Sequence, residues 1–373
     1  MSAASSTDVV RQRLRSQALA GSAAPSPVDV VERMLAMQAQ DLRWAKWAVA
    51  IRSPGTTEAD VDALIDSGRI VRSWPMRGTL HFVPGHELTW MLSLTTPRLW
   101  AGSARRRREL DLDETLIERA RTVAVEVLSG GRQLSRADFL TELERSGIDA
   151  SGQRGYHLIW HLAQSGTLCW GRQVGAQQLL TLLQEWVPVH RALEPDEALG
   201  EFLLRYLTGH GPATVADFAW WAQVTGAQAK VALAVIRPRL VEWQVDGVSH
   251  YLPVTADTAS HAWSRPGRGR DAVLALPGFD EYYLGYQDRR FAADPADFDR
   301  VVPGKNGIFL PALLRHGRVI GTWRREWKPR LITVQPQPFA PETPAEAQHT
   351  DRALREYARF LDRPVTVLPS ING

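Results

Sequence analysis

Apolar residues in the first 250 positions recur mostly with the spacing of amphipathic helices, interrupted by short alternating runs that indicate strands. Residues 134–147 form a capped amphipathic stretch that ends at Gly147, and residues 151–166 repeat the pattern after a short turn. Residues 167–183 then predict two strands around a glycine-containing turn. The order helix, turn, helix and hairpin predicts a winged helix.

The same order occurs twice more along the chain. Residues 196–253 predict three helices followed by two strands, with Asp246 and Gly247 between them, a dipeptide strongly favoured in hairpins. Residues 27–83 predict a weaker copy, in which a helix begins at Ser26-Pro27 and a hairpin comes last. We therefore predict three tandem winged-helix modules, with boundaries at 8–110, 111–192 and 193–262.

The last 120 residues follow a different pattern. They begin with a buried strand and a tyrosine-rich acidic turn, and continue with two strands that read as a pair. A helix is predicted from about Pro344 to Leu361, with Thr343 as its N-cap. We assign residues 263–373 to a C-terminal α+β segment with a β-hairpin or small barrel, and the whole chain to the α+β class.

The predicted second helices of the modules differ in their chemistry. Arg154, Tyr156 and His157 would suit contacts in a DNA major groove. The corresponding helix of the third module carries only Lys230 and is otherwise apolar, so it reads as core. Each module is thus either a DNA reader or scaffold, and base reading by all three is not expected.

Charge adds a weak indication of nucleic acid. The net charge is only +3 and the pI about 9.2, but basic residues gather in three clusters, which are residues 105–108, residues 265–270 and residues 318–330. Such clusters are either solvated surface or contacts to phosphate.

Several classes of protein are not indicated. The only cysteine, Cys169, excludes an internal disulfide framework and a multi-cysteine zinc site. No apolar run is long enough for a transmembrane helix, and the N-terminus does not read as a secretory signal, so we expect a cytoplasmic protein. The metalloprotease, P-loop, dinucleotide and nucleophile-elbow motifs do not occur, and the histidines are scattered. We therefore expect no metal and no cofactor.

One short stretch stands out, MLAMQAQD at residues 34–41. Read as part of a helix, Val31, Met34 and Leu35 form an apolar stripe on which Gln38 would be the next member, and Gln40 follows two residues later. An amide in such a place either satisfies backbone groups at a helix end or holds a water molecule. An amide takes no proton near neutral pH, so it would serve only a reaction whose leaving group departs readily.

Four segments together resemble the AlkZ/YcaQ family of bacterial DNA glycosylases, over about residues 8–365. They are MQAQD, WPMRGTLHFV (residues 74–83), LPGFDEYYLGYQDR (residues 276–289) and GRVIGTWRR (residues 317–325). The resemblance implies a C-shaped arrangement of winged helices around a concave DNA-binding face. It also implies excision of bases alkylated at guanine N7, including adducts and cross-links made by DNA-damaging natural products.

The resemblance further assigns roles to the two glutamines. The family signature is Gln, an apolar residue, then Gln or Asp, and Gln38-Ala39-Gln40 is similar to the AlkZ-like form associated with self-resistance in antibiotic producers. It implies that Gln38 and Gln40 are catalytic and place a water beneath C1′ of the sugar. The implied partner is double-stranded DNA with alkylated guanine, bound by a monomer near the nucleoid.

Other residues are weaker candidates for DNA contacts. Arg77 and His81, on the first predicted hairpin, would meet phosphate or the lesion, or else form a polar strand face. A predicted strand offers an aromatic ring for stacking and charges for phosphate, in Trp323, Arg324 and Arg325. A predicted turn at Lys305 and Asn306 would enter a groove. Their alternatives are a strand end and an exposed turn. For Asp280 and Glu281 we expect a structural role, as caps or partners of arginine.

Two alternatives without catalysis stay open at this point. A winged-helix transcriptional regulator would need a dimerisation element and a strongly basic recognition helix, and the chain offers no heptad seam. A drug-sequestering protein would stack an aromatic toxin against some of the 14 tryptophans.

Overall fold

The computed structural model describes residues 2–175, 177–254, 272–305, 307–328 and 331–371. Over these residues the protein is an α+β fold in which three groups of helices each precede a pair of antiparallel strands. The predicted α+β class is confirmed. The order of elements agrees with the one expected, while the assignment to winged helices and the four boundaries stay predictions.

The first group of helices leads to the hairpin that carries Arg77 and His81. Its elements are α1 (Ser6–Ser16), α2 (Pro27–Met34), β2 (Met37–Gln38), α3 (Leu42–Ala50), α4 (Glu58–Asp66), β3 (Ile70–Met76) and β4 (Thr79–Pro84). Each helix starts where a polar side chain accepts a backbone N–H of the first turn, as N-caps do; the caps are Ser5, Ser26, Asp41 and Thr57.

The second and third groups repeat the order of helices before strands. The second contains α5 (Leu88–Glu109), α6 (Glu114–Leu128), α7 (Arg136–Arg145), α8 (Arg154–Gln164), β5 (Leu168–Val174), β6 (Gln177–Leu182) and α9 (Leu183–Trp186). The third contains α10 (Pro195–His210), α11 (Val215–Ala222), α12 (Gly226–Ile236), β7 (Leu240–Val245) and β8 (Val248–Pro253). The two helices and hairpin expected over 134–183 are confirmed as α7, α8 and β5–β6, and the hairpin around Asp246-Gly247 as β7–β8.

The C-terminal segment is a sheet covered by a helix. It contains β9 (Val273–Ala275), α13 (Glu281–Leu284), α14 (Phe298–Val301), β10 (Ala312–Arg315), β11 (Arg318–Lys328), β12 (Leu331–Pro338), α15 (Pro344–Leu361) and β13 (Val365–Val367). Helix α15 begins and ends where the sequence predicts, and Thr343 caps it in a capping box with Glu346. Single 3₁₀ turns lie at Gly85–Glu87, Arg237–Arg239, Pro295–Asp297 and Pro303–Lys305.

The strands form three sheets. The first two hairpins join in one sheet of order β2-β4-β3-β5-β6, in which Arg72 of β3 pairs with Trp170 of β5. The C-terminal sheet has the order β13-β12-β11-β10-β9, and β1 (Ser2–Ala3) adds a parallel strand to the β7–β8 hairpin.

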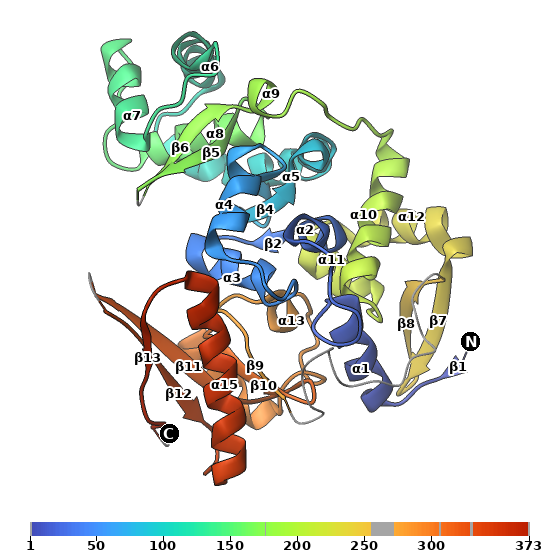
Figure 1. Ribbon diagram of the computed structural model, residues 1–373. Coiled ribbons are helices and arrows are strands. Elements are labelled where there is room, and N and C mark those ends of the chain that lie inside the picture. Colours follow the sequence, from blue (N-terminus) through green and yellow to red (C-terminus); the bar gives the residue numbers. More distant parts are fainter. Residues whose placement is uncertain (1, 176, 255–271, 306, 329–330, 372–373) are drawn as a thin grey trace.

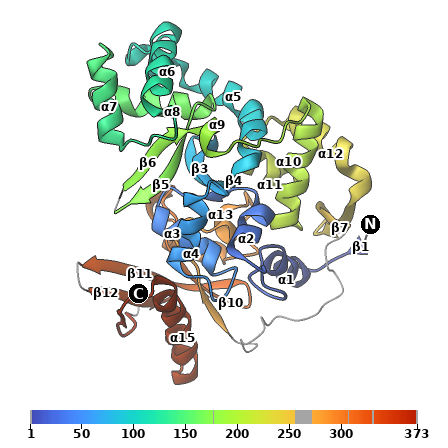
Figure 2. The ribbon, with the colours of Figure 1, turned by 45° about the horizontal axis from the view of Figure 1, so that its top comes forward.

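Residues far apart in the sequence share one core. Apolar residues of α1 and α3 pack with the C-terminal sheet and α15, and the Trp47 indole donates to the carbonyl of Ala275 at 2.7 Å. Figure 1 shows α6 and α7 at one end of the molecule and α15 at another, with α2, β2 and α13 between them. Figure 2 keeps α6 and α7 opposite α15 after rotation. Among the described residues, no helix is long and apolar enough to cross a membrane.

The structure corrects the helical interpretation of Gln38. Helix α2 ends at Met34, and Leu35 turns the chain with φ of 61°. Gln38 therefore lies on strand β2 and not on the buried stripe of a helix.

Candidate active site

The Gln-Ala-Gln spacing follows from the alternation of an extended chain. Strand β2 runs antiparallel to β4, with Gln38 opposite His81, and the N–H of Ala39 donates to the Leu80 carbonyl at 2.7 Å. Met37 and Ala39 are fully buried in the core beneath, whereas Gln38 is half-buried and Gln40 exposed. Because successive side chains of a strand alternate between its faces, the spacing of two puts both amides on one face.

The β3–β4 turn brings Arg77 to Gln38. Arg77 and Gly78 are the two turn residues between the paired Met76 and Thr79, and their φ values of 56° and 67° are those of a type I′ hairpin turn. The Nη2 of Arg77 donates to Gln38 Oε1 at 3.3 Å and lies 2.8 Å from His81 Nε2. The Arg77 side chain is only 10% exposed.

His81 is a buried neutral imidazole. Its Nδ1 lies 2.8 Å from the Thr79 carbonyl and must donate to it, so its Nε2 is the acceptor for Arg77. Burial, with the charge of Arg77 adding to it, lowers the pKa of His81 to about 3. Because His81 has no exposed surface, the expected contact of His81 with phosphate is wrong; it supports Arg77 from below.

Glu281, at the start of α13, lies against the backbone of Gln38. Its Oε1 accepts the Gln38 N–H at 3.1 Å and lies 3.8 Å from Arg77 Nη2. Its Oε2 accepts the Trp221 indole N–H at 2.9 Å and lies 3.3 Å from His210 Nε2. Burial raises the pKa of this carboxyl, but the His210 hydrogen bond and the charge of Arg77 outweigh it and bring the pKa to about 2.

Gln40 is held by backbone groups. Its Oε1 accepts the Leu80 N–H at 3.3 Å, and Arg72 binds the carbonyls of Ala39 and Gln40 at 2.8 and 3.2 Å. Within the described ranges, the Nε2 of neither glutamine has a hydrogen-bond partner. Each amide thus keeps its two donors, and one lone pair of its oxygen, for another molecule.

Asp41 ties this segment to the C-terminal sheet. It caps α3 and accepts both contacts of Arg325 Nη2, at 2.9 and 3.1 Å. The Arg325 guanidinium also lies 3.4 Å from the Trp44 ring centroid and donates to the Tyr357 hydroxyl at 2.9 Å. Because the Arg325 side chain is only 9% exposed and is paired with Asp41, the expected contact of Arg325 with phosphate is corrected to an internal ion pair.

The neighbours of Arg325 have opposite environments. Trp323 is 1% exposed, and its indole N–H donates to the Leu276 carbonyl at 2.7 Å. Stacking of Trp323 on a base would require opening the core, so that expectation is wrong. Arg324 points to solvent and binds Gln335 Oε1 at 2.6 and 3.1 Å, which leaves it open to phosphate. Asn306 and the side chain of Lys305 lie outside the described residues, as does the cluster at 265–270.

Two adjacent carboxylates differ in what they contact. Asp280 caps α13 and binds Arg52 with both oxygens at 2.8 and 2.9 Å, so the expected structural role is confirmed. Glu281 instead reaches the candidate site. Sequence reasoning missed this because the contact joins residues 243 positions apart. The acidic pair in DEYY was the only signal available, and it does not say which carboxylate faces the site.

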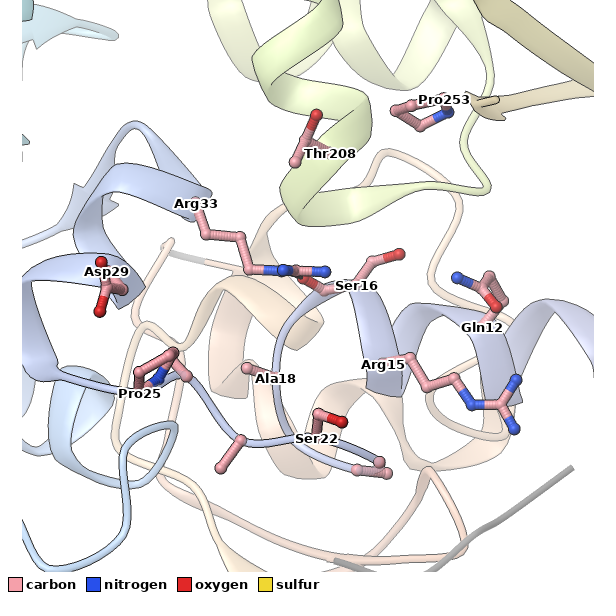
Figure 3. Close-up of a pocket in the computed structure, with 14 residues that line it drawn as sticks. Gln12, Arg15, Ser16, Ala18, Ser22, Pro25, Asp29, Arg33, Thr208 and Pro253 are labelled. Atoms are coloured by element: carbon pink, nitrogen blue, oxygen red, sulfur yellow. Dashed lines mark hydrogen bonds between the residues drawn. The ribbon is translucent and has the colours of Figure 1, made fainter. Parts of the chain in front are cut away.

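Two other features lie apart from the glutamines. Among the described residues, one group could hold a metal by its geometry, namely Glu32, His86 and Glu87. Its two carboxylates are already paired with Arg205, which lies 2.8 Å from Glu87 and 3.2 Å from Glu32. A cavity of about 510 Å³ between α1, α2, α10 and β8 is lined by polar and small side chains (Figure 3), and neither glutamine lines it.

Comparison with known proteins indicates the family of this chain. A model of the family DNA glycosylase AlkZ-like matches residues 31–360. The chain is 26% identical over 391 positions to an interstrand DNA cross-link repair glycosylase of Streptomyces sahachiroi, covering 98% of this chain and 100% of that protein. The solved structure of Streptomyces sahachiroi DNA glycosylase AlkZ matches with a TM-score of 0.78 at 25% identity, covering 98% of this chain and 100% of that one.

The chain therefore belongs to the AlkZ-like DNA glycosylase family. It is a DNA glycosylase, an enzyme that hydrolyses N-glycosyl bonds in DNA. The resemblance seen in the sequence is confirmed, and the regulator and the drug-sequestering protein are set aside.

Proposed function

We propose that this enzyme hydrolyses the N-glycosidic bond of N7-alkylguanine in double-stranded DNA, acting as a monomer without a metal. N7-alkylguanine carries a positive charge, so its bond to the sugar is already weakened. The enzyme then needs to place a water below C1′ and stabilise the sugar as it gains oxocarbenium character. It does not need to protonate the departing base.

The placement of Gln38 and Gln40 supports this chemistry best. The alternation of the extended chain puts both amides on one face of residues 38–40, and their oxygens are oriented by Arg77 and by the Leu80 N–H. A carbonyl oxygen has two lone pairs, so each glutamine can accept a further hydrogen bond from water. Loss of one such positioned group costs roughly 3 kcal/mol, or about two orders of magnitude in rate.

The nearest carboxylates are not free to act as a base. Glu281 is buried and already contacts the Gln38 N–H, Trp221 and His210. Asp41 is paired with Arg325. The enzyme should therefore depend on a cationic leaving group. It should act weakly on uncharged lesions such as uracil or 8-oxoguanine.

The substrate is proposed to be a bulky adduct or cross-link made by a DNA-damaging natural product. The curated relative is named for interstrand cross-link repair, which supports this class of lesion. Such a lesion would suit tandem winged helices arranged around a concave DNA-binding face. This face would be open, so that the lesion need not be flipped into a closed pocket. Resistance of a producing cell to its own toxin, or base excision repair of its chromosome in the cytoplasm, would be the biological role.

The test is release of free base from duplex DNA that carries N7-methylguanine or a bulky N7-guanine adduct, without added metal. Gln38→Ala and Gln40→Ala should each lose about 100-fold in the single-turnover rate with unchanged DNA affinity. Gln348→Ala, on the exposed side of α15, is the matched control and should behave as wild type. Full activity in both site variants would return the amides to a structural role. DNA binding without release of any N7 adduct would contradict the substrate.

A further inference from the structure

Arg77 occupies a backbone position that its side chain does not favour. Three hairpin turns among the described residues have two successive positive φ values, and their first residues are Arg77, Asp246 and His316. Aspartate is one of the residues that adopt this conformation readily, and arginine is not. Asp246 and His316 are exposed, whereas Arg77 is folded back against β2 and α13. The choice of arginine at this turn thus needs a reason other than the turn.

The contacts of Arg77 supply one. Its Nη2 is the common neighbour of Gln38 Oε1 at 3.3 Å, His81 Nε2 at 2.8 Å and Glu281 Oε1 at 3.8 Å. A guanidinium only donates, so the oxygen of the Gln38 amide must face it and the NH₂ group must face away. The two ends of an amide have nearly the same shape, so without this donor nothing else among the described contacts would distinguish them.

Glu281 holds the same residue from the other side. It accepts the backbone N–H of Gln38 and pairs with Arg77, and is itself fixed by Trp221 and His210. Gln40 differs, because its oxygen is held by the backbone N–H of Leu80, which no side-chain replacement removes. The two glutamines are therefore positioned by different kinds of group.

We propose that Arg77, held by Glu281, is a positioning residue that sets the orientation of the Gln38 amide and leaves Gln40 unaffected. The inference rests on the proposed role of Gln38 in placing the water. It assigns to Arg77 no contact with DNA. Its effect on the reaction passes entirely through one neighbouring side chain.

A double-mutant cycle tests this dependence on duplex DNA carrying N7-methylguanine, with enzyme in excess. Arg77→Met should lower the single-turnover rate of base release by at least about 10-fold at unchanged DNA affinity. The same change should have no further effect in a Gln38→Ala background, but keep its full effect in a Gln40→Ala background. Arg77→Lys, which keeps the charge and one donor, should recover part of the rate.

The outcomes separate the two proposals. If the Arg77→Met effect multiplies with Gln38→Ala as fully as with Gln40→Ala, Arg77 acts independently and this inference is overturned, while the proposed function stands. If Gln38→Ala is as active as wild type, this inference and the proposed role of Gln38 in placing the water both fall, whereas the proposed substrate falls only if no N7 adduct is released. Should Arg77→Met not fold, Glu281→Gln, which keeps the size of the side chain, goes through the same cycle with the same expectation.

Discussion

The turns at residues 76–79 and 245–248 have the same backbone shape and opposite surroundings. In both, two residues with positive φ connect strands in tight register. Asp246 is 61% exposed and lies 3.4 Å from Arg290, whereas Arg77 is 10% exposed among Gln38, His81 and Glu281. The turn at 245–248 has the residue that the backbone prefers, whereas the turn at 76–79 accepts a local cost of about 1 kcal/mol that brings the Arg77 guanidinium to the candidate site. The turn that departs from the local preference is thus the one at the candidate site.

The largest expected difference between the turns is in the pH dependence of stability. The pKa of His81 is lowered from 6.5 to about 3 in the folded protein, so below pH 6.5 the unfolded chain binds a proton that the folded one does not. The stabilisation from neutral His81 is complete above pH 6.5 and is lost as the pH falls toward 3. Between pH 7 and 5 this amounts to about 2 kcal/mol.

Urea denaturation at pH 7 and 5 measures this effect. His81→Gln should remove about 2 kcal/mol of the pH dependence between the two values, relative to wild type. Asp246→Asn, in the exposed turn, is the control and should follow the wild-type curve. Parallel curves for His81→Gln and wild type would show that His81 is not held neutral.

Exchanging the turn chemistries gives the next largest effect. Asp246→Arg should destabilise the protein by about 1 kcal/mol, because arginine lacks the preference of aspartate for positive φ, and should leave base release unchanged. Arg77→Asn should relax its backbone but slow base release at least about 10-fold. Denaturant melts and single-turnover rates on the same samples check both. An Asp246→Arg variant as stable as wild type would remove the backbone cost from the comparison.

The smallest effect concerns arginines on the C-terminal sheet, where the same contrast of buried and exposed positions recurs. Arg324→Gln should lower the slope of log affinity for DNA against log salt by about one if the exposed Arg324 binds a phosphate. Arg325→Gln should leave that slope unchanged and lower the melting temperature, because it breaks the pair with Asp41. A reduced slope for Arg325→Gln instead would restore the phosphate role to Arg325.

The sequence predicted most of the elements because their signals are local. The helices α7, α8 and α15 and the Asp246-Gly247 hairpin depend on caps, periodicity and turn residues a few positions apart. The end of α2 was missed because Leu35 adopts a positive φ that no glycine announces. The alternation that places Gln38 beside Gln40 was consequently assigned to the wrong kind of element.

The candidate site could be predicted only in part, because local patterns do not encode contacts between distant residues. The resemblance made Gln38 and Gln40 the catalytic candidates, and the groups that orient them in the structure come from elsewhere in the chain. Contacts such as Glu281 with Gln38 and Arg325 with Asp41 span more than 240 residues, and no local pattern encodes them. Trp323 was misassigned because an aromatic residue beside two arginines reads alike in a core and on a binding surface.

Ala39, between the two glutamines, has a consequence for how the signature can vary. It has no exposed surface and packs on the core beneath β2, where a longer side chain would overfill the space at a cost of about 1–3 kcal/mol. An insertion of one residue would turn one amide into that core and bring the apolar residue to the surface. Tolerance to mutation at this candidate site is therefore set as much by the buried Ala39 as by the two glutamines on either side of it.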